Sequence, residues 1–276
     1  MKLENKTVLI TGGTSGIGLE LARQLLQRRN TVIVTGRDQH KLHATGRALP
    51  GVHVFQSDVS DPAAITVLRD RVVAQFPALN VLVNNAGIMR NLNFNRPDGL
   101  DDVTREIETN LSGPVRMVEH FLPHLKSREN ALIVNVSSGL AFVPFALSPI
   151  YSASKAAIHS FTQVLRAQLA GTSVTVIELA PPPVETALFR GEFAEELKGE
   201  KAMDAGVFAA RAVAGIEAGK LEIRPGISNV LNIMSRVAPR FAFNQMAKML
   251  PPKNGAVTRL NQNAAPPDGA TRSNSH

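Results

Sequence analysis

Short apolar runs alternate with longer stretches of helical periodicity along the first 225 residues. The runs consist mainly of β-branched and aliphatic residues and show little alternation with polar ones, which is typical of strands covered on both faces. We therefore expect strands at residues 7–10, 31–34, 52–55, 81–83, 132–136, 174–177 and 221–223.

One helical stretch lies between each expected strand and the next. Connections of this kind are right-handed crossovers, which build a parallel sheet with helices on both faces. The start of one helix is marked by Ser60-Asp61-Pro62, a cap and a first-turn proline, ahead of residues 63–76. The pattern predicts an α/β fold, a Rossmann-type doubly wound parallel sheet of about seven strands in three α/β/α layers.

The C-terminal part of the chain differs from the rest. We expect one catalytic-size domain over residues 1–225, followed by an amphipathic helical segment over 226–250. From Pro251 the composition turns to Pro, Asn, Gly, Ala, Thr and Ser, so residues 251–276 are expected to form a disordered tail.

The formal net charge of +7 is concentrated in this C-terminal part. Residues 1–219 hold 22 Lys and Arg against 21 Asp and Glu, whereas residues 220–276 hold 8 against 2. A nucleic-acid surface would combine basic residues with exposed aromatics or a known reading element, and neither is evident, so we expect no nucleic-acid partner. The basic amphipathic segment 226–250 could contact an anionic membrane surface, cover a substrate pocket or pack against another subunit, and we favour packing on protein.

The chain has no cysteine, which excludes disulfides, thiolate metal sites and a cysteine nucleophile. His120 and His124 share a helical face but lack a third ligand, so we expect no metal. The polar start and the short apolar run 7–10 do not suit a signal peptide, and no apolar stretch reaches the roughly 20 residues of a spanning helix. A cytoplasmic location is expected.

A glycine-rich turn follows the first expected strand. Residues 11–18 read Thr-Gly-Gly-Thr-Ser-Gly-Ile-Gly and open a helix. Glycines at a strand-to-helix turn let the backbone approach a pyrophosphate and direct N–H groups of the helix N-terminus at it. The position predicts a dinucleotide site, with spacing Gly-x₃-Gly-x-Gly instead of the general Gly-x-Gly-x-x-Gly.

This spacing resembles the glycine motif of the short-chain dehydrogenase/reductase family. Further motifs of that family follow in order over about residues 5–190, including Asn84-Asn85-Ala86-Gly87 after the fourth strand and Tyr151-x-x-x-Lys155. The resemblance implies that the dinucleotide contacts Gly12, Thr14, Ser15, Gly16, Ile17, Gly18, Asp58, Val59, Asn85, Ala86 and Gly87.

The end of the second strand governs the choice of cofactor. A carboxylate there would bind the ribose 2′-hydroxyl of NAD and repel a 2′-phosphate, but this chain has Gly36-Arg37. A fixed cation at Arg37 can donate charge-assisted hydrogen bonds to a 2′-phosphate, so NADP(H) is preferred. Asp38 is the counter-argument, because NAD(H) would compete if this carboxylate folded back toward the ribose.

Four residues resemble the family's catalytic tetrad. Spacing of four places Tyr151 and Lys155 on one helix face, where the lysine cation would lower the phenol pKa from about 10 and make Tyr151 the general acid and base. The resemblance implies that Lys155 also binds the cofactor ribose. It further implies that Ser138 holds the substrate carbonyl and that Asn110 anchors a water linked to Lys155.

After the sixth strand the family carries Pro-Gly-x-x-x-Thr, where this chain has Pro181 and then Pro182 in place of the glycine. Proline lacks an N–H, so we expect Pro181, Val184 and Thr186 to contact the nicotinamide, with any backbone donation coming from Val184. This variant, together with residues 139–144, resembles a bacterial branch, the DltE-like oxidoreductases.

Apolar residues lie near both of these motifs. We expect Ser138, Phe142, Phe145 and Phe189 to contact substrate, with a lid over about residues 187–205. An apolar pocket of this kind favours a hydrophobic ketone or aldehyde.

The sequence thus predicts an NADP(H)-dependent oxidoreductase that acts on a carbonyl or secondary alcohol, and the resemblance implies a homodimer or homotetramer. One alternative is a dinucleotide-sensing regulatory protein without turnover, which should lack part of the tetrad. Another is a sugar-nucleotide epimerase or dehydratase, which would need a larger C-terminal domain than the residues after Thr186 provide.

Overall fold

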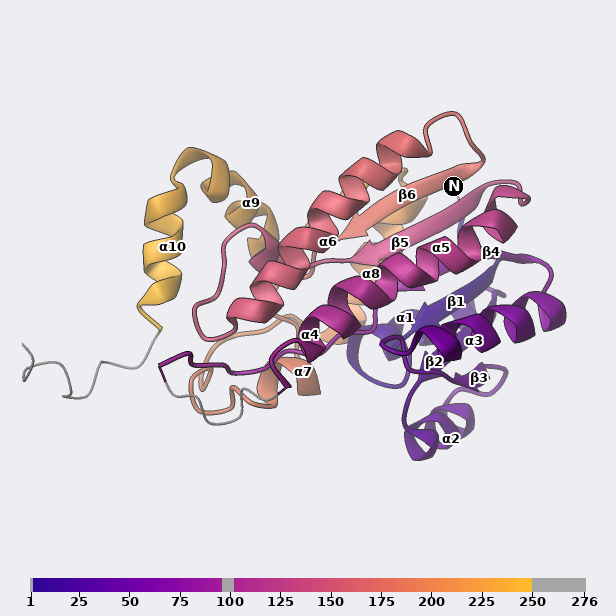
Figure 1. The fold of residues 1–276 in the computed structure, drawn as a ribbon, viewed down its shortest axis with the longest axis horizontal. Coiled ribbons are helices and arrows are strands. Elements are labelled where there is room, and N and C mark those ends of the chain that lie inside the picture. The colour runs from indigo at the N-terminus through magenta and orange to yellow at the C-terminus, as the bar shows by residue number, and fades with distance from the viewer. Residues whose placement is uncertain (1, 96–101, 250–276) are drawn as a thin grey trace, which may run out of the picture.

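A computed structural model describes residues 2–95 and 102–249 of the chain. Its centre is a seven-stranded parallel sheet in the order β3-β2-β1-β4-β5-β6-β7, which confirms the expected doubly wound fold (Figure 1). The strands are β1 (Thr7–Thr11), β2 (Thr31–Gly36), β3 (His53–Gln56), β4 (Leu79–Asn84), β5 (Ala131–Val136), β6 (Val174–Leu179) and β7 (Glu222–Ile223).

Helices connect these strands and cover both faces of the sheet. The helices are α1 (Gly16–Gln27), α2 (Gln39–Ala48), α3 (Pro62–Gln75), α4 (Arg105–Ile107), α5 (Gly113–Lys126), α6 (Pro149–Gln168), α7 (Ala187–Arg190), α8 (Ala205–Glu217), α9 (Ile227–Val237) and α10 (Pro239–Ala247). A π-helical turn, Glu108–Ser112, joins α4 to α5, and a 3₁₀ turn, Gly139–Ala141, follows β5. The expected start of α3 is correct, because the Asp61 carboxylate accepts the Ala63 N–H at 2.8 Å and Pro62 is the first helical residue.

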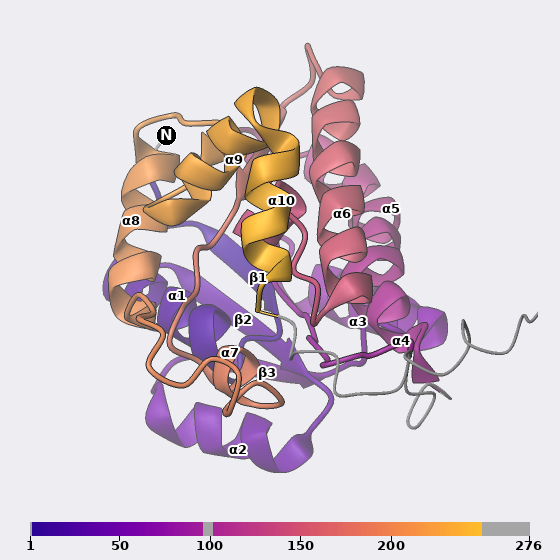
Figure 2. The same cartoon turned by 90° about the vertical axis from the view of Figure 1, so that its left-hand side faces the viewer.

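The unbroken apolar runs have a simple explanation in β1. Val8 and Ile10 pack with α1 and α8, whereas Leu9 between them packs on the opposite face with α3, α5 and α6. Successive side chains of a strand point to opposite faces, so a strand between two helical layers is apolar at every position. Figure 2 shows α1 and α8 on one side of the sheet and α5 and α6 on the other.

The strand order reverses between β1 and β4, and all strands are parallel. The carboxyl ends of β1 and β4 therefore diverge into separate loops and leave a crevice, which is where open α/β sheets bind ligands. This topology brings the glycine-rich turn after β1 and the loops after β2, β4, β5 and β6 to one edge of the sheet.

Helices α9 and α10 form a hairpin that projects beside α6, at the left of Figure 1. Within the described residues, no helix has the length and apolar character needed to cross a membrane. The expected tail, 251–276, lies outside the described residues.

Candidate active site

A pocket of about 570 Å³ occupies the crevice at the carboxyl ends of the strands. Its walls come from the turn after β1, from the ends of β2, β4, β5 and β6, and from α6, α7, α9 and α10. Most of the site residues expected from the sequence line it, namely Gly12, Thr14, Ser15, Gly16, Ile17, Arg37, Asp58, Val59, Asn85, Ala86, Gly87, Ser138, Phe145, Tyr151, Lys155, Pro181, Val184, Thr186 and Phe189.

The glycine-rich turn brings backbone close to the pocket and to its neighbours. Gly12 and Gly16 adopt φ values of +65° and +52°, which favour glycine. Gly18 does not line the pocket but packs tightly against its neighbours. A Cβ there would lie 2.5 Å from both the Gly12 carbonyl oxygen and the Asn85 amide nitrogen. Gly18 thus permits close packing of α1 against the strands, and Ser15 leaves the first-turn N–H groups of α1 without a side-chain cap, as a pyrophosphate site requires.

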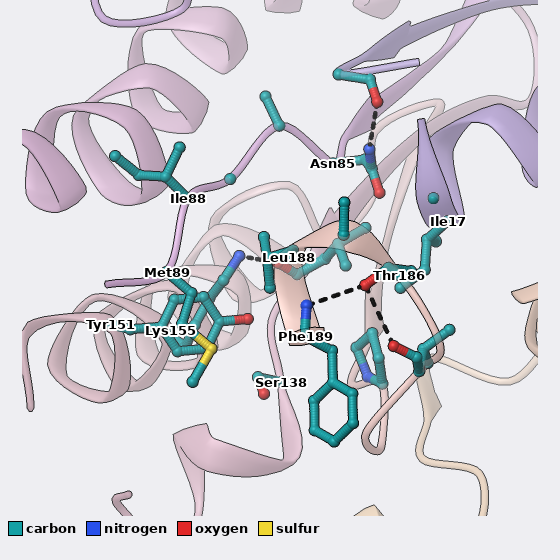
Figure 3. Close-up of a pocket in the computed structure, with 18 of the residues that line it drawn as sticks. Ile17, Asn85, Ile88, Met89, Ser138, Tyr151, Lys155, Thr186, Leu188 and Phe189 are labelled. Carbon is teal, nitrogen blue, oxygen red and sulfur yellow. Dashed lines mark hydrogen bonds between the residues drawn. The ribbon is translucent and has the colours of Figure 1, made fainter. Parts of the chain in front are cut away.

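Asn85 ties the loop after β4 to the glycine-rich turn. Its side-chain amide donates to the carbonyl oxygens of Thr11 at 3.0 Å and Gly12 at 3.1 Å. The Thr11 hydroxyl in turn accepts the N–H groups of Asn85 and Ala86 at 3.0 and 3.1 Å (Figure 3 labels Asn85). These bonds fix the two loops on either side of the point where the strand order reverses.

The end of β2 presents cations to the same pocket. Arg37 and Lys41 both line it. The Asp38 carboxylate instead caps α2, accepting the N–H groups of His40 at 2.9 Å and Lys41 at 3.1 Å, and these bonds lower its pKa. Asp38 also lines the pocket, with one of its carboxylate oxygens held at the N-terminus of α2.

Tyr151 and Lys155 lie on one face of α6, and Ser138 follows β5 (Figure 3). The Lys155 ammonium nitrogen is 5.6 Å from the Tyr151 ring centroid and donates to the Val136 carbonyl oxygen at 2.9 Å. The Ser138 side chain lies close enough to the Tyr151 phenol to favour its ionised form. The three functional groups therefore meet at the inner end of the pocket.

The expected depression of the Tyr151 pKa relied on Lys155 together with the positive nicotinamide ring, and the protein groups alone do not produce it. Burial of the phenol raises its pKa to about 12, the Ser138 side chain opposes this rise, and the charge of Glu106 adds to it. Burial also lowers the Lys155 pKa to about 8, which weakens the cation that was expected to stabilise a phenolate. Desolvation is the largest cause of both shifts.

Asn110 lies in the π-helical turn and is fully buried. Its side-chain oxygen accepts the Ile88 N–H at 2.9 Å, and its amide donates to the Ile88 carbonyl at 2.9 Å and the Ser154 hydroxyl at 3.2 Å. A Cβ placed on Gly87 would lie 3.3 Å from this oxygen and 3.6 Å from the Lys155 nitrogen. Asn110 therefore holds the loop beside Lys155 but does not line the pocket itself, and its role in anchoring a water stays a prediction.

Residues 6–197 match the family model described as short chain dehydrogenase. The chain belongs to the short-chain dehydrogenase family. It is 48% identical over 191 residues to the uncharacterized oxidoreductase DltE of Bacillus subtilis, covering 68% of this chain and 75% of that protein, which confirms the resemblance to that branch.

Solved structures of short-chain dehydrogenases share the fold. A short chain dehydrogenase from Burkholderia cenocepacia in complex with NADP superposes with a TM-score of 0.77 at 25% identity, covering 91% of this chain and all of that one. One from Burkholderia phymatum in complex with NAD gives a TM-score of 0.75 at 24% identity, covering 84% and 93%. These neighbours include both nicotinamide cofactors.

This short-chain dehydrogenase buries a carboxyl group that the sequence analysis missed. Glu106 is fully buried, one carboxylate oxygen accepts the Arg90 N–H at 2.9 Å, and the other has no hydrogen-bond partner among the described residues. Burial raises its pKa to about 7. Glu106 and Asn110 lie four residues apart and both hold the loop formed by residues 88–90, but no local sequence pattern marks this glutamate as buried.

The outer part of the pocket is apolar. Phe145, Leu147, Phe193 and Leu197 form a buried cluster, and Met89, Leu140, Phe189, Met246 and Met249 pack against it. The sequence analysis did not place Met89, Ile227, Leu231, Met246 or Met249 in the dehydrogenase's pocket, although all of them line it.

Phe142 lies away from this apolar wall, contrary to expectation. Its ring packs edge-on against His159 at 5.0 Å and beneath the Arg224 guanidinium at 5.9 Å, and it is not among the described residues that line the pocket. Phe142 ends the 3₁₀ turn after β5, which directs it toward α6 and β7 instead of the pocket.

Polar contacts join the loop after β4 to the segment expected to form the lid. Asn91 donates its N–H to Glu192 at 2.9 Å and its side-chain amide to Glu196 at 2.7 Å. Thr186 caps α7, because its hydroxyl accepts the Phe189 N–H at 3.2 Å while donating to the Val184 carbonyl (Figure 3). In this short-chain dehydrogenase the Thr186 hydroxyl thus stabilises the start of the lid segment.

Proposed function

We propose that the protein is an NADP(H)-dependent oxidoreductase that transfers a hydride between nicotinamide and a carbonyl or secondary alcohol of a hydrophobic substrate. The main support is that Ser138, Tyr151 and Lys155 come from separate parts of the chain and meet at the inner end of one pocket. That pocket continues to the glycine-rich turn in one direction and to an apolar wall in the other.

Reduced nicotinamide, when bound, supplies the hydride that the carbonyl carbon receives. Tyr151 gives its phenolic proton to the carbonyl oxygen, and Ser138 donates a hydrogen bond to that oxygen. The π bond of the carbonyl is thereby replaced by a C–H and an O–H bond, and the C–O single bond remains. A phenol is protonated at neutral pH, so Tyr151 can act as the acid in the reductive direction.

Residues around the pocket fit a dinucleotide. The uncapped first turn of α1 would receive the pyrophosphate, and Lys155 would bind the ribose hydroxyls. Preference for NADP(H) is supported by Arg37 and Lys41 in the pocket wall and by the engagement of Asp38 in capping α2. These two cations attract a 2′-phosphate, and the Asp38 oxygen that caps α2 is occupied by the N–H groups of His40 and Lys41.

NADPH oxidation should be screened against hydrophobic ketones, aldehydes and quinones with the parent chain and Tyr151→Phe. We expect turnover by the parent and a loss of at least about a hundredfold in kcat for the variant, with NADPH binding retained, because the phenolic proton is removed. Equal turnover by the two proteins would refute the role of Tyr151. NADPH binding without turnover of any carbonyl would favour the regulatory alternative.

Arg37→Asp tests the cofactor preference separately. Loss of charge-assisted hydrogen bonds and gain of a repulsive carboxylate should weaken NADPH by about a hundredfold while leaving NADH binding within a few fold. Asp38→Ala is the matched control: it removes the cap of α2 and should lower stability, while the NADPH to NADH ratio changes far less than in Arg37→Asp. An unchanged ratio in Arg37→Asp would contradict the 2′-phosphate role.

A further inference from the structure

The inner face of the α9–α10 hairpin packs against the rest of the protein. Leu231 lines the pocket and lies within 3.2 Å of where a Gly139 Cβ would be, while Met246 and Met249 pack on the apolar cluster around Phe145. Ala242 is buried as well. This face accounts for the expected packing on protein, and it forms part of the pocket wall.

The outer face of the same hairpin is apolar and exposed. The exposed fractions are 53% for Val230, 50% for Ile233, 77% for Val237 and 58% for Phe241. Half of the twelve large apolar side chains that are exposed among the described residues lie between Ile227 and Phe243. Spacing of three and four residues gathers Val230, Ile233 and Val237 on one side of α9, and a concentration of this kind marks an interaction surface.

Positive charge accompanies these apolar residues without any negative charge. Arg236, Arg240 and Lys248 are exposed on the hairpin, and the sequence from Gly226 to Met249 contains no Asp or Glu. A two-fold interface with a second copy would bring the same cations of both chains together, which opposes self-association. An anionic lipid surface offers negative headgroups to the cations and an apolar interior to the exposed apolar side chains.

We propose that the outer face of the α9–α10 hairpin docks on an anionic lipid bilayer. Val237 and Phe241 would enter the interfacial region while Arg236 and Arg240 meet lipid phosphates, as in amphipathic helices that lie in the plane of a membrane. The inner face of the hairpin lines the apolar part of the pocket, so docking brings that wall next to the membrane surface. Docking itself does not depend on the proposed redox activity.

Co-sedimentation of the full chain with vesicles tests this surface. We expect binding to vesicles of phosphatidylcholine with phosphatidylglycerol, binding at least about tenfold weaker to phosphatidylcholine alone, and weaker binding at high salt. The combined change Arg236→Gln and Arg240→Gln should weaken binding by about twenty-fivefold, taking about fivefold for each cation at the surface.

Val237→Asp with Phe241→Asp removes the apolar contribution and should abolish measurable binding. Val67→Asp on α3 is the matched control, since Val67 is 56% exposed on a different element, and it should bind like the parent. Neither Val237 nor Phe241 lines the pocket, so turnover of a soluble carbonyl should remain unchanged and any loss of binding is separable from a failure of the proposed function.

Two results would overturn the proposal. The first is equal affinity of the parent for neutral and anionic vesicles, or no affinity for either. The second is a parent dimer, measured by light scattering, that Val237→Asp with Phe241→Asp converts to a monomer, because a second copy would then cover this face.

Discussion

The strongest quantitative expectation concerns ionisation of Tyr151, the only tyrosine in the chain. Its side chain is 7% exposed, and burial raises its pKa to about 12 from an ordinary value of about 10. A difference of two units corresponds to about 3 kcal/mol against the buried phenolate. Absorbance of phenolate in the native chain should therefore appear about two pH units later than in the unfolded chain.

The same difference makes stability depend on pH. Below pH 10 the phenol is neutral in both states and has no effect. Between about pH 10 and 12 the unfolded chain ionises while the folded one does not, so the parent should lose up to about 3 kcal/mol relative to Tyr151→Phe. Lys155, with a pKa lowered to about 8, acts in the opposite direction between pH 8 and 10.5, and the comparison cancels it because both proteins contain this lysine.

In the assay, phenolate absorbance is recorded directly after a rapid jump to high pH, before the chain has time to unfold. Tyr151→Phe, which has no phenol, provides the background absorbance. The chain unfolded in denaturant provides the reference midpoint near pH 10. Ser138→Ala should move the native midpoint upward, because the serine side chain lowers the pKa, and Glu106→Gln should move it downward by removing a nearby negative charge. A native midpoint at or below 10 would refute the reasoning that desolvation dominates.

Two further predictions concern buried groups near the pocket. Glu106→Gln keeps an acceptor for the Arg90 N–H but cannot ionise. As pH rises from 4.5 to 7, the parent should therefore lose up to about 3 kcal/mol of stability relative to this variant, measured by denaturant unfolding. Parallel curves of stability against pH for the two proteins would contradict this expectation. Gly18→Ala should cost about 1–3 kcal/mol and weaken NADPH, because its Cβ would clash with backbone, whereas Gly46→Ala in α2, with its nearest neighbour at 4.0 Å, should be neutral or stabilising.

Local sequence patterns were sufficient for much of the fold. The run 7–10 became β1 (Thr7–Thr11), and the Asp61-Pro62 signal became the start of α3. Each depends on residues that are neighbours along the chain, where propensity, capping and turn chemistry act directly. The glycine-rich turn and the spacing of Tyr151 and Lys155 are equally local, and for that reason they were readable in advance.

The burial of individual side chains could not be predicted from such local patterns. Nothing in Arg105-Glu106-Ile107-Glu108 distinguishes a buried carboxyl from an exposed one, yet Glu106 is fully buried beneath the loop after β4 while Glu108 pairs with Arg116 at 2.8 Å. The effect of burial on the Tyr151 pKa was missed for the same reason, because the sequence shows a lysine four residues away but not the loss of water around both groups.

The sequence by itself determined the strands, the glycine-rich turn, the spacing of Tyr151 and Lys155 and the family, since these depend on short-range geometry. Only the tertiary structure decided that Asp38 caps α2, that Phe142 lies away from the pocket, and that α9 and α10 divide into an inner wall and an exposed basic, apolar face. Those outcomes depend on which distant segments exclude water from a side chain, and that exclusion exists only after the layers have packed together.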